Sequence, residues 1–164
     1  MFIELPAVWL YGVNIVGILC AHLGLAWLAT RLPGSLFERH RRLFATAAWE
    51  ATCYEQCLRI RAWKHLLPDA AGWFGGFPKK NLRAVNPAYL RAYSRETCRG
   101  EFSHWCQMVV IAGFMAWTPW PALLIIFSYA LASNLPCIAT LRYTRLRIAR
   151  LMEHEPTPVT EFPD

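Results

Sequence analysis

Charged side chains are absent from two long stretches of this 164-residue sequence, and only 17% of all its residues are charged. No Asp, Glu, Lys or Arg occurs in the 26 positions from Leu5 to Thr30, or in the 40 positions from Phe102 to Leu141. A helix that crosses the hydrocarbon core of a bilayer needs about 20 mostly apolar residues. The first stretch therefore predicts one membrane span, and the second predicts a hairpin of two spans.

The N-terminus also lacks the Lys or Arg residues that begin a secretory signal peptide. Its only charged residue before the apolar run is Glu4. The run itself is longer than the roughly 7 to 15 apolar residues of a signal peptide. We therefore expect this segment to remain in the protein as a membrane span.

Motifs of several enzyme classes are absent as well. The five histidines show no H-E-x-x-H spacing, and no Gly-x-Ser-x-Gly nucleophile elbow occurs. No metal site and no cofactor are therefore expected. The sequence pI is about 9.2, but the basic residues border the apolar stretches, so the lipid bilayer and not nucleic acid is the expected partner.

The Lys and Arg residues that are present indicate the topology. Thirteen of the 17 lie between Arg31 and Arg99, and the other four lie between Arg142 and Arg150. The positive-inside rule then places the middle region and the C-terminus in the cytoplasm, and the N-terminus outside. We expect one all-α, multi-pass domain, residues 1–164, in the cell (inner) membrane. Its three transmembrane helices are expected at about residues 5–31, 102–118 and 121–141.

Residues 33–101 are expected to form cytoplasmic interfacial helices and a loop. Ser35 and Glu38 have the spacing of a capping box, and apolar positions recur at three and four as far as Leu58. This helix either lies in the membrane interface or covers the bundle from below, and the pattern does not separate the two. Prolines and glycines in residues 59–85 predict a Gly/Pro-rich loop.

A further helix is expected to begin at Asn86-Pro87, which has the pattern of an N-cap followed by proline in the first turn. This helix leads to Glu101 and His104, which are three residues apart and so share a helix face. A histidine beside a carboxylate has the basic nitrogen, the oriented ring and the stabilised imidazolium that a general base needs. The same spacing fits a structural pair at the end of a span, and spacing alone favours neither reading.

A cationic stripe leads up to this pair, because Arg91, Arg95 and Arg99 are spaced four apart. Such a stripe attracts anionic lipid headgroups. It suits the phosphates of a coenzyme A thioester equally well.

Three segments, in this order, resemble recurring motifs of the glycosyl-diaponeurosporenoate acyltransferase (CrtO-type) family of small membrane proteins. They are residues 61–65 (RAWKH), residues 96–105 with Glu-x-x-His-Trp, and residues 132–147 with Asn-x-Pro followed by Arg-Tyr-x-Arg. The resemblance implies transfer of a fatty acyl group to a sugar hydroxyl of a membrane glycolipid, such as a glycosylated carotenoid. The chain departs from the family pattern at Leu141 and Thr144, where Gln and Asn are frequent.

Carried over residue by residue, the resemblance makes His104 and Glu101 the candidates for catalysis. The candidate substrate-binding residues, from the family positions and the stripe together, are Trp63, Lys64, Arg95, Arg99, Asn134, Arg142, Tyr143 and Arg145.

The expected protein is therefore an all-α membrane acyltransferase with its active site at the cytoplasmic interface. The donor is expected to be an acyl thioester of coenzyme A or of acyl carrier protein, and the acceptor a membrane lipid. His104 would take the proton of the acceptor hydroxyl as its oxygen attacks the thioester. An acyl-enzyme on Cys98 is a less favoured mechanism. The alternative is a non-catalytic membrane protein whose basic cytoplasmic face binds anionic lipid or a partner enzyme.

Overall fold

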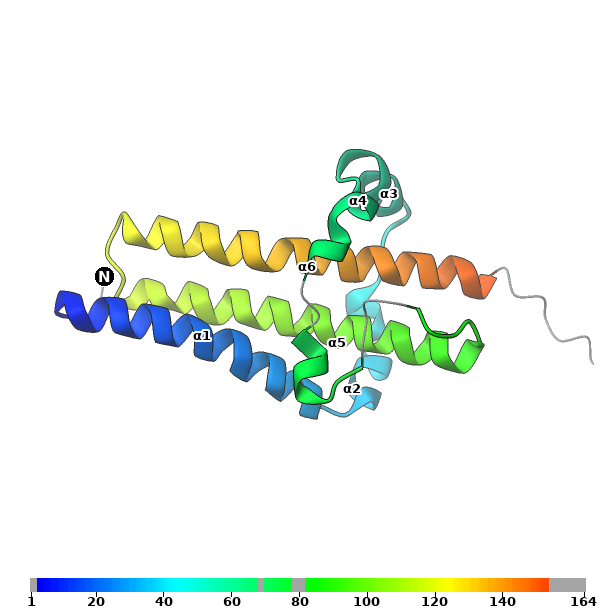
Figure 1. Cartoon of the computed structure of the whole chain (residues 1–164), viewed down its shortest axis with the longest axis horizontal. Helices are drawn as coiled ribbons and strands as arrows, with labels where there is room; N and C mark the ends of the chain where they lie inside the picture. Colours follow the sequence, from blue (N-terminus) through cyan, green and yellow to red (C-terminus); the bar gives the residue numbers. More distant parts are fainter. Residues whose placement is uncertain (1–2, 68–69, 78–81, 154–164) are drawn as a thin grey trace, which may run out of the picture.

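Three long helices form the body of the protein in a computed structural model, which describes residues 3–67, 70–77 and 82–153. They are α1 (Ala7–Arg31), α5 (Pro87–Ala112) and α6 (Ala122–Glu153). Figure 1 shows them side by side in one layer, with α5 between α1 and α6. The expectation of an all-α fold is confirmed.

Two of these helices, α1 and α6, are long and apolar enough to cross a membrane. Helix α5 is not, because it contains the charged residues Arg91, Arg95, Glu96, Arg99 and Glu101. The expected second span, residues 102–118, corresponds to the apolar end of α5 and the 3-10 turn η5 (Gly113–Ala116). Three spans and their orientation remain predictions.

Helix α5 begins where the sequence indicates. The Asn86 side chain accepts a hydrogen bond of 2.8 Å from the Tyr89 backbone N–H, and Pro87 occupies the first turn. Both features satisfy or remove backbone donors that the first helical turn leaves unpaired. The N-cap prediction is confirmed.

Short elements connect α1 to α5. In chain order they are α2 (Gly34–Arg39), η1 (Arg41–Phe44), α3 (Ala48–Thr52), η2 (Cys53–Cys57), α4 (Ile60–Trp63), η3 (Lys64–Leu66) and η4 (Ala70–Phe74). The segment expected to be one loop, residues 59–85, therefore contains three short helical elements in its described part. In Figure 1, α3 and α4 lie beside α6, and α2 lies near the end of α1.

The single helix expected from Ser35 to Leu58 is wrong. Helix α2 begins at Gly34 after Pro33, and no side chain caps it. The chain then leaves the helical path at residues 45–47. There the Ala47 N–H donates to the Glu50 carboxylate, and the Ala45 carbonyl accepts from Arg142 of α6. Long-range contacts with α6 thus replace the hydrogen bonds of a continuous helix.

Close packing joins the three long helices. Ala21, Ile111 and Ala130 form a buried cluster with one residue from each helix. Nearer the middle of α5, a Cβ atom on Gly100 would lie only 3.0 Å from the Leu141 side chain. The absence of a side chain at Gly100 therefore lets α5 and α6 approach closely at the level of the expected site.

Candidate active site

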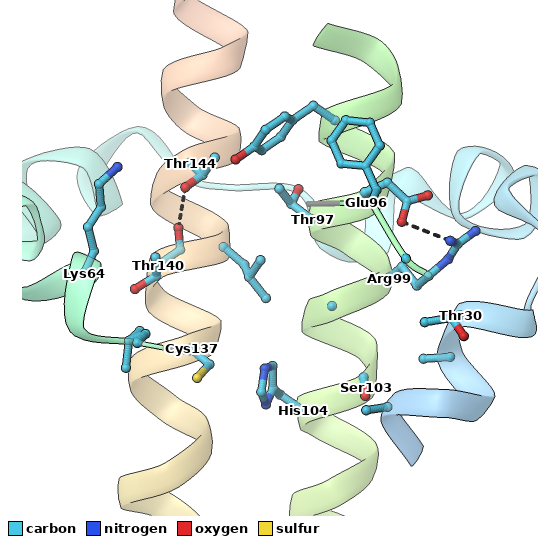
Figure 2. Close-up of a pocket in the computed structure, with 18 of the residues that line it drawn as sticks. Thr30, Lys64, Glu96, Thr97, Arg99, Ser103, His104, Cys137, Thr140 and Thr144 are labelled. Carbon is cyan, nitrogen blue, oxygen red and sulfur yellow. Dashed lines mark hydrogen bonds and ion pairs between the residues drawn. The ribbon is translucent and has the colours of Figure 1, made fainter. Parts of the chain in front are cut away.

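A cavity of about 680 Å³ lies along one face of α5 and is walled by α1 and α6. His104, Ser103 and Arg99 line it from α5, Thr30 from α1, and Cys137, Thr140 and Thr144 from α6 (Figure 2). Lys64, Trp73 and Phe77, from the segments between α4 and α5, also line it. Segments that are distant in sequence thus contribute to a single, partly open cavity.

His104 points into this cavity and is held by α6. Its Nδ1 lies 2.9 Å from Oδ1 of Asn134, which is fully buried. The Asn134 Nδ2 donates to the Ala130 carbonyl at 2.9 Å. A carbonyl can only accept, so the amide NH₂ must face Ala130 and Oδ1 must face the ring. The neutral His104 ring therefore has its hydrogen on Nδ1 and its lone pair on Nε2.

A polar cluster closes the end of the cavity nearest the N-terminus of α6. His22 Nδ1 lies 3.0 Å from Gln107 Oε1, and His22 Nε2 lies 3.3 Å from the Tyr129 hydroxyl. Gln107 Nε2 donates to the His22 carbonyl at 3.2 Å. This cluster connects α1, α5 and α6 at one level, about one helical turn beyond His104.

Positive charge gathers at the opposite end of the cavity. Lys64, Arg99 and Arg147 line it there, and Glu96 is the carboxylate among the described lining residues. Glu96 is paired with Arg99 at 2.9 Å, and Arg99 also donates to the Leu32 carbonyl at the end of α1.

The other predicted catalytic residue, Glu101, lies in a buried network on a different face of α5. We call Glu50, Glu101, Arg142 and Arg145 the arginine–glutamate network. Arg142 donates to Glu101 at 2.8 Å and to both carboxylate oxygens of Glu50, at 2.8 and 2.6 Å. Arg145 donates to the second oxygen of Glu101. Glu101 is only 2% exposed, so both of its oxygens are used inside the protein.

Contacts in and beside the network shift the pKa values of Glu50 and Tyr54. Hydrogen bonds from Arg142 lower the pKa of Glu50 to about 2. Burial, together with the hydrogen bond to Glu50, raises the pKa of Tyr54 to about 12. Glu50 is therefore an acceptor held by arginine, with a lowered pKa that is the opposite of what proton uptake near neutral pH requires.

The remaining predicted substrate-binding residues make internal contacts. Tyr143 is buried, and its hydroxyl accepts from Arg61 Nε at 2.6 Å. Trp63 donates to the Leu58 carbonyl at 2.8 Å. Arg95 lies 3.8 Å from Glu38. Of the ten residues predicted for the site, the cavity lining therefore contains Lys64, Arg99 and His104.

Cys98 is placed away from the cavity. It lines a smaller hollow with Arg145, and burial raises the pKa of its thiol. A nucleophilic cysteine needs a lowered pKa and access to substrate. Within residues 3–67, 70–77 and 82–153, no group of three or more His, Cys, Asp or Glu side chains is arranged to hold a metal ion.

Comparison with known proteins identifies the family. Residues 40–154 match the CrtO family, glycosyl-4,4'-diaponeurosporenoate acyltransferase. The chain belongs to the CrtO family. A glycosyl-4,4'-diaponeurosporenoate acyltransferase of Staphylococcus haemolyticus is 31% identical over 121 residues, covering 72% of this chain and 70% of its own. The protein of that name from Staphylococcus aureus strain N315 is 26% identical over 137 residues, covering 82% of each chain. No solved structure matches.

Membership of the CrtO family makes the chain an acyltransferase, as the sequence motifs predict. The non-catalytic alternative is not supported. The matched residues include every part of the cavity except the wall that α1 supplies.

Two residues that contribute to this region are not among the predicted site residues. Arg147 lines the cavity, and Glu50 binds Arg142 from a segment expected to be uninterrupted helix. The position of Arg147 on α6 could have been found from helical phase, because it lies about 140° around the helix from Arg142. Glu50 gave no local signal, since its partner is 92 residues away.

Proposed function

We propose that this protein transfers a fatty acyl group from a thioester to a sugar hydroxyl of a membrane glycolipid, of the glycosylated carotenoid class for which the family is named. The observation that carries the proposal is His104, oriented by Asn134 at the wall of a cavity of about 680 Å³. Glu101 is assigned a structural role, because two arginines hold its oxygens.

The proposed chemistry is direct transfer. His104 Nε2 takes the proton of the sugar hydroxyl while that oxygen attacks the thioester carbonyl. The tetrahedral intermediate then collapses, the carbon–sulfur bond breaks, and the imidazolium returns the proton to the departing thiolate. One ester and one free thiol result. Asn134 keeps the lone pair on Nε2 by accepting from Nδ1–H, as the third member of a catalytic triad does.

The long helices support a membrane acceptor. The most apolar 18-residue windows of α1 and α6 are only 17% and 22% buried, so neither helix has the environment of a soluble core helix. Val8, Ile15 and Leu19 of α1 and Ile125 of α6 are exposed. Lipid is the solvent that suits such surfaces. The polyene of a carotenoid glycolipid would reach the cavity along these walls.

We further propose that the apolar end of α5 is the middle one of three spans in the cell membrane, with the N-terminus outside and the active site at the cytoplasmic interface. The positive charges of residues 31–99 and 142–150 support this orientation. A reporter fused to the C-terminus is expected in the cytoplasm, and one inserted at Thr118 is expected outside. An exported C-terminus would contradict the orientation.

The reaction is tested with the purified full chain in detergent. It is supplied with a long-chain acyl-coenzyme A and a glycosylated carotenoid, and mass spectrometry detects the acylated glycolipid while a thiol reagent detects released coenzyme A. The same carotenoid without its sugar is the matched control. We expect the two products in equal amounts and only with the glycosylated acceptor. Thiol release without ester formation would indicate hydrolysis and contradict the proposal.

A further inference from the structure

Two cations, Lys64 and Arg147, line the part of the cavity nearest the C-terminus of α6. Lys64 of η3 is partly buried, Arg147 of α6 is exposed, and both line the cavity. Among the described residues, neither has a carboxylate within ion-pair distance. The pKa of Lys64 is lowered, first by burial and then by the positive charges of Arg147 and Arg61. Two cations held together without a counter-charge form a site that favours an anion.

The distance from these cations to the proposed base is set by α6. Asn134, which binds His104, and Arg147 are thirteen residues apart on this helix, or about 20 Å along its axis. An anion bound at Arg147 would therefore lie too far away to touch the reacting carbonyl. A donor that used both places would need a flexible linker with its thioester at one end and its anionic group at the other.

The wall between the two places is polar and carries acceptors. Thr140 and Thr144 line the cavity, and their hydroxyl hydrogens are already donated to the Pro136 and Thr140 carbonyls at 2.8 Å (Figure 2). Each hydroxyl oxygen thus keeps lone pairs but has no hydrogen left to donate. A ligand that lies along this wall is favoured when it offers N–H donors.

We infer that the donor is bound through a phosphopantetheine arm, with its phosphate between Lys64 and Arg147, its amide N–H groups along Thr144 and Thr140, and its thioester at His104. This inference rests on the proposed acyl transfer. An extended pantetheine chain covers the spacing, contains two amides, and ends in the sulfur that a thioester requires. Coenzyme A and acyl carrier protein share this arm, so the site recognises the chemistry that the two carriers have in common.

Binding of carriers without an acyl group tests the inference separately from catalysis. The full chain in detergent is titrated by calorimetry with 4'-phosphopantetheine, coenzyme A, holo-acyl carrier protein, and pantetheine, which lacks the phosphate. We expect phosphopantetheine to bind about tenfold or more tightly than pantetheine, since hydrogen bonds to charged groups are worth at least that factor. The first three ligands then rank the carriers. Equal affinity for pantetheine and phosphopantetheine would overturn the inference.

Substitutions at Arg147 test whether this residue binds the phosphate. Arg147→Gln is expected to weaken phosphopantetheine binding about tenfold, and Arg147→Lys to restore most of it. Arg150→Gln is the matched control, because Arg150 is three residues further along α6 and lies 3.5 Å from Glu55, outside the cavity lining. If Arg147→Gln and Arg150→Gln lowered the affinity for phosphopantetheine equally, the effect would come from the overall positive charge. That result would overturn the assignment of the phosphate to Arg147. Normal binding without turnover would count against the proposed function alone.

Discussion

Two faces of α5 meet α6 in opposite ways. On the cavity face, His104, Lys64 and Arg147 point toward space that a ligand can fill. On the other face, the arginine–glutamate network places two carboxylates and two guanidinium groups in mutual contact, nearly without solvent. Both faces are rich in titratable groups, but on the cavity face Lys64 and Arg147 have no carboxylate within ion-pair distance among the described residues.

Glu101 and His104 look equivalent in the sequence but lie on different faces of α5. Glu101 and His104 are three residues apart, which places them about 60° apart around the helix axis. That angle is small enough to suggest a pair and large enough to send the side chains to different neighbours. Glu101 contacts Arg142 and Arg145, whereas His104 contacts Asn134. The packing partner decides whether such a residue stabilises the fold or serves the reaction.

The largest expected effect is the loss of activity on the cavity face. His104→Gln keeps a hydrogen-bonding side chain but cannot take up a proton, so turnover should fall by at least about 10²-fold. Folding should be nearly unchanged, as judged by elution profile and thermal unfolding in detergent. His40→Gln is the matched control, because His40 is exposed and bonds only its own helix turn, at the Leu36 carbonyl. Turnover above about a tenth of wild type would contradict a proton-transfer role.

A substitution on the network face should lower the stability of the protein and leave the turnover per folded molecule nearly unchanged. Glu101→Gln leaves Arg142 and Arg145 without the charge that both of them bind, and breaking a buried pair costs about 3–5 kcal/mol. We expect a free energy of unfolding lower by about 3 kcal/mol, with turnover per folded molecule within a few-fold of wild type.

Glu55→Gln is the control for this change. Glu55 pairs with Arg61 and Arg150 on the surface, where solvent screens such pairs and they contribute little to stability. A Glu101→Gln protein that is stable but inactive would contradict the structural role of Glu101. It would support a catalytic role instead.

Local signals in the sequence were sufficient for some of these features. Asn86 caps α5 through a contact within its own turn. The first charge-free stretch corresponds to α1, and the second to the end of α5, η5 and the first part of α6. Both features depend on neighbours in sequence, which a single chain reveals. The motif positions His104 and Asn134 were also found, although not their contact with each other.

The remaining features depend on contacts between distant segments. Ser35 has a capping spacing, yet α2 begins one residue earlier, at Gly34, and ends at Arg39. Further along, residues 45–47 leave the helical path and contact Glu50 and Arg142. The four arginines of residues 142–150 look alike in sequence. Helical phase turns Arg147 away from Arg142, but only the docking of α3 and α5 against α6 shows which of these arginines join the arginine–glutamate network.

Acid should lower the stability that Glu50 gives to the network face. Near neutral pH this stability should not change with pH. The folded-state pKa of Glu50 is about 2, against an ordinary value of 4.5, because Arg142 donates to both of its oxygens. The corresponding stability is therefore fully present above about pH 5.5 and is lost as the pH falls toward 2. Linkage for a lowering of this size amounts to about 3 kcal/mol.

Unfolding of the wild type and of Glu50→Gln, followed from pH 7 to pH 3, measures this loss. The difference in unfolding free energy should be constant above about pH 5.5 and should narrow below about pH 4.5. Glu38→Gln is the control, because Glu38 is exposed and lies 3.8 Å from Arg95. A difference that stays constant to pH 3 would mean that Glu50 titrates alike in the folded and unfolded chains.

The smallest expected effect concerns the residue that connects the two helices behind the cavity. Asn134 orients His104 without reaching the substrate, so Asn134→Leu should lower kcat about tenfold and leave KM nearly unchanged. Asn134→Asp keeps an acceptor for His104 Nδ1–H and should retain more of kcat than the leucine variant. A purely structural role predicts a different pattern, in which both variants lose activity only in proportion to folded protein. Equal kcat per folded molecule in the two variants would therefore reject the positioning role, and His104 would need another group to fix its tautomer.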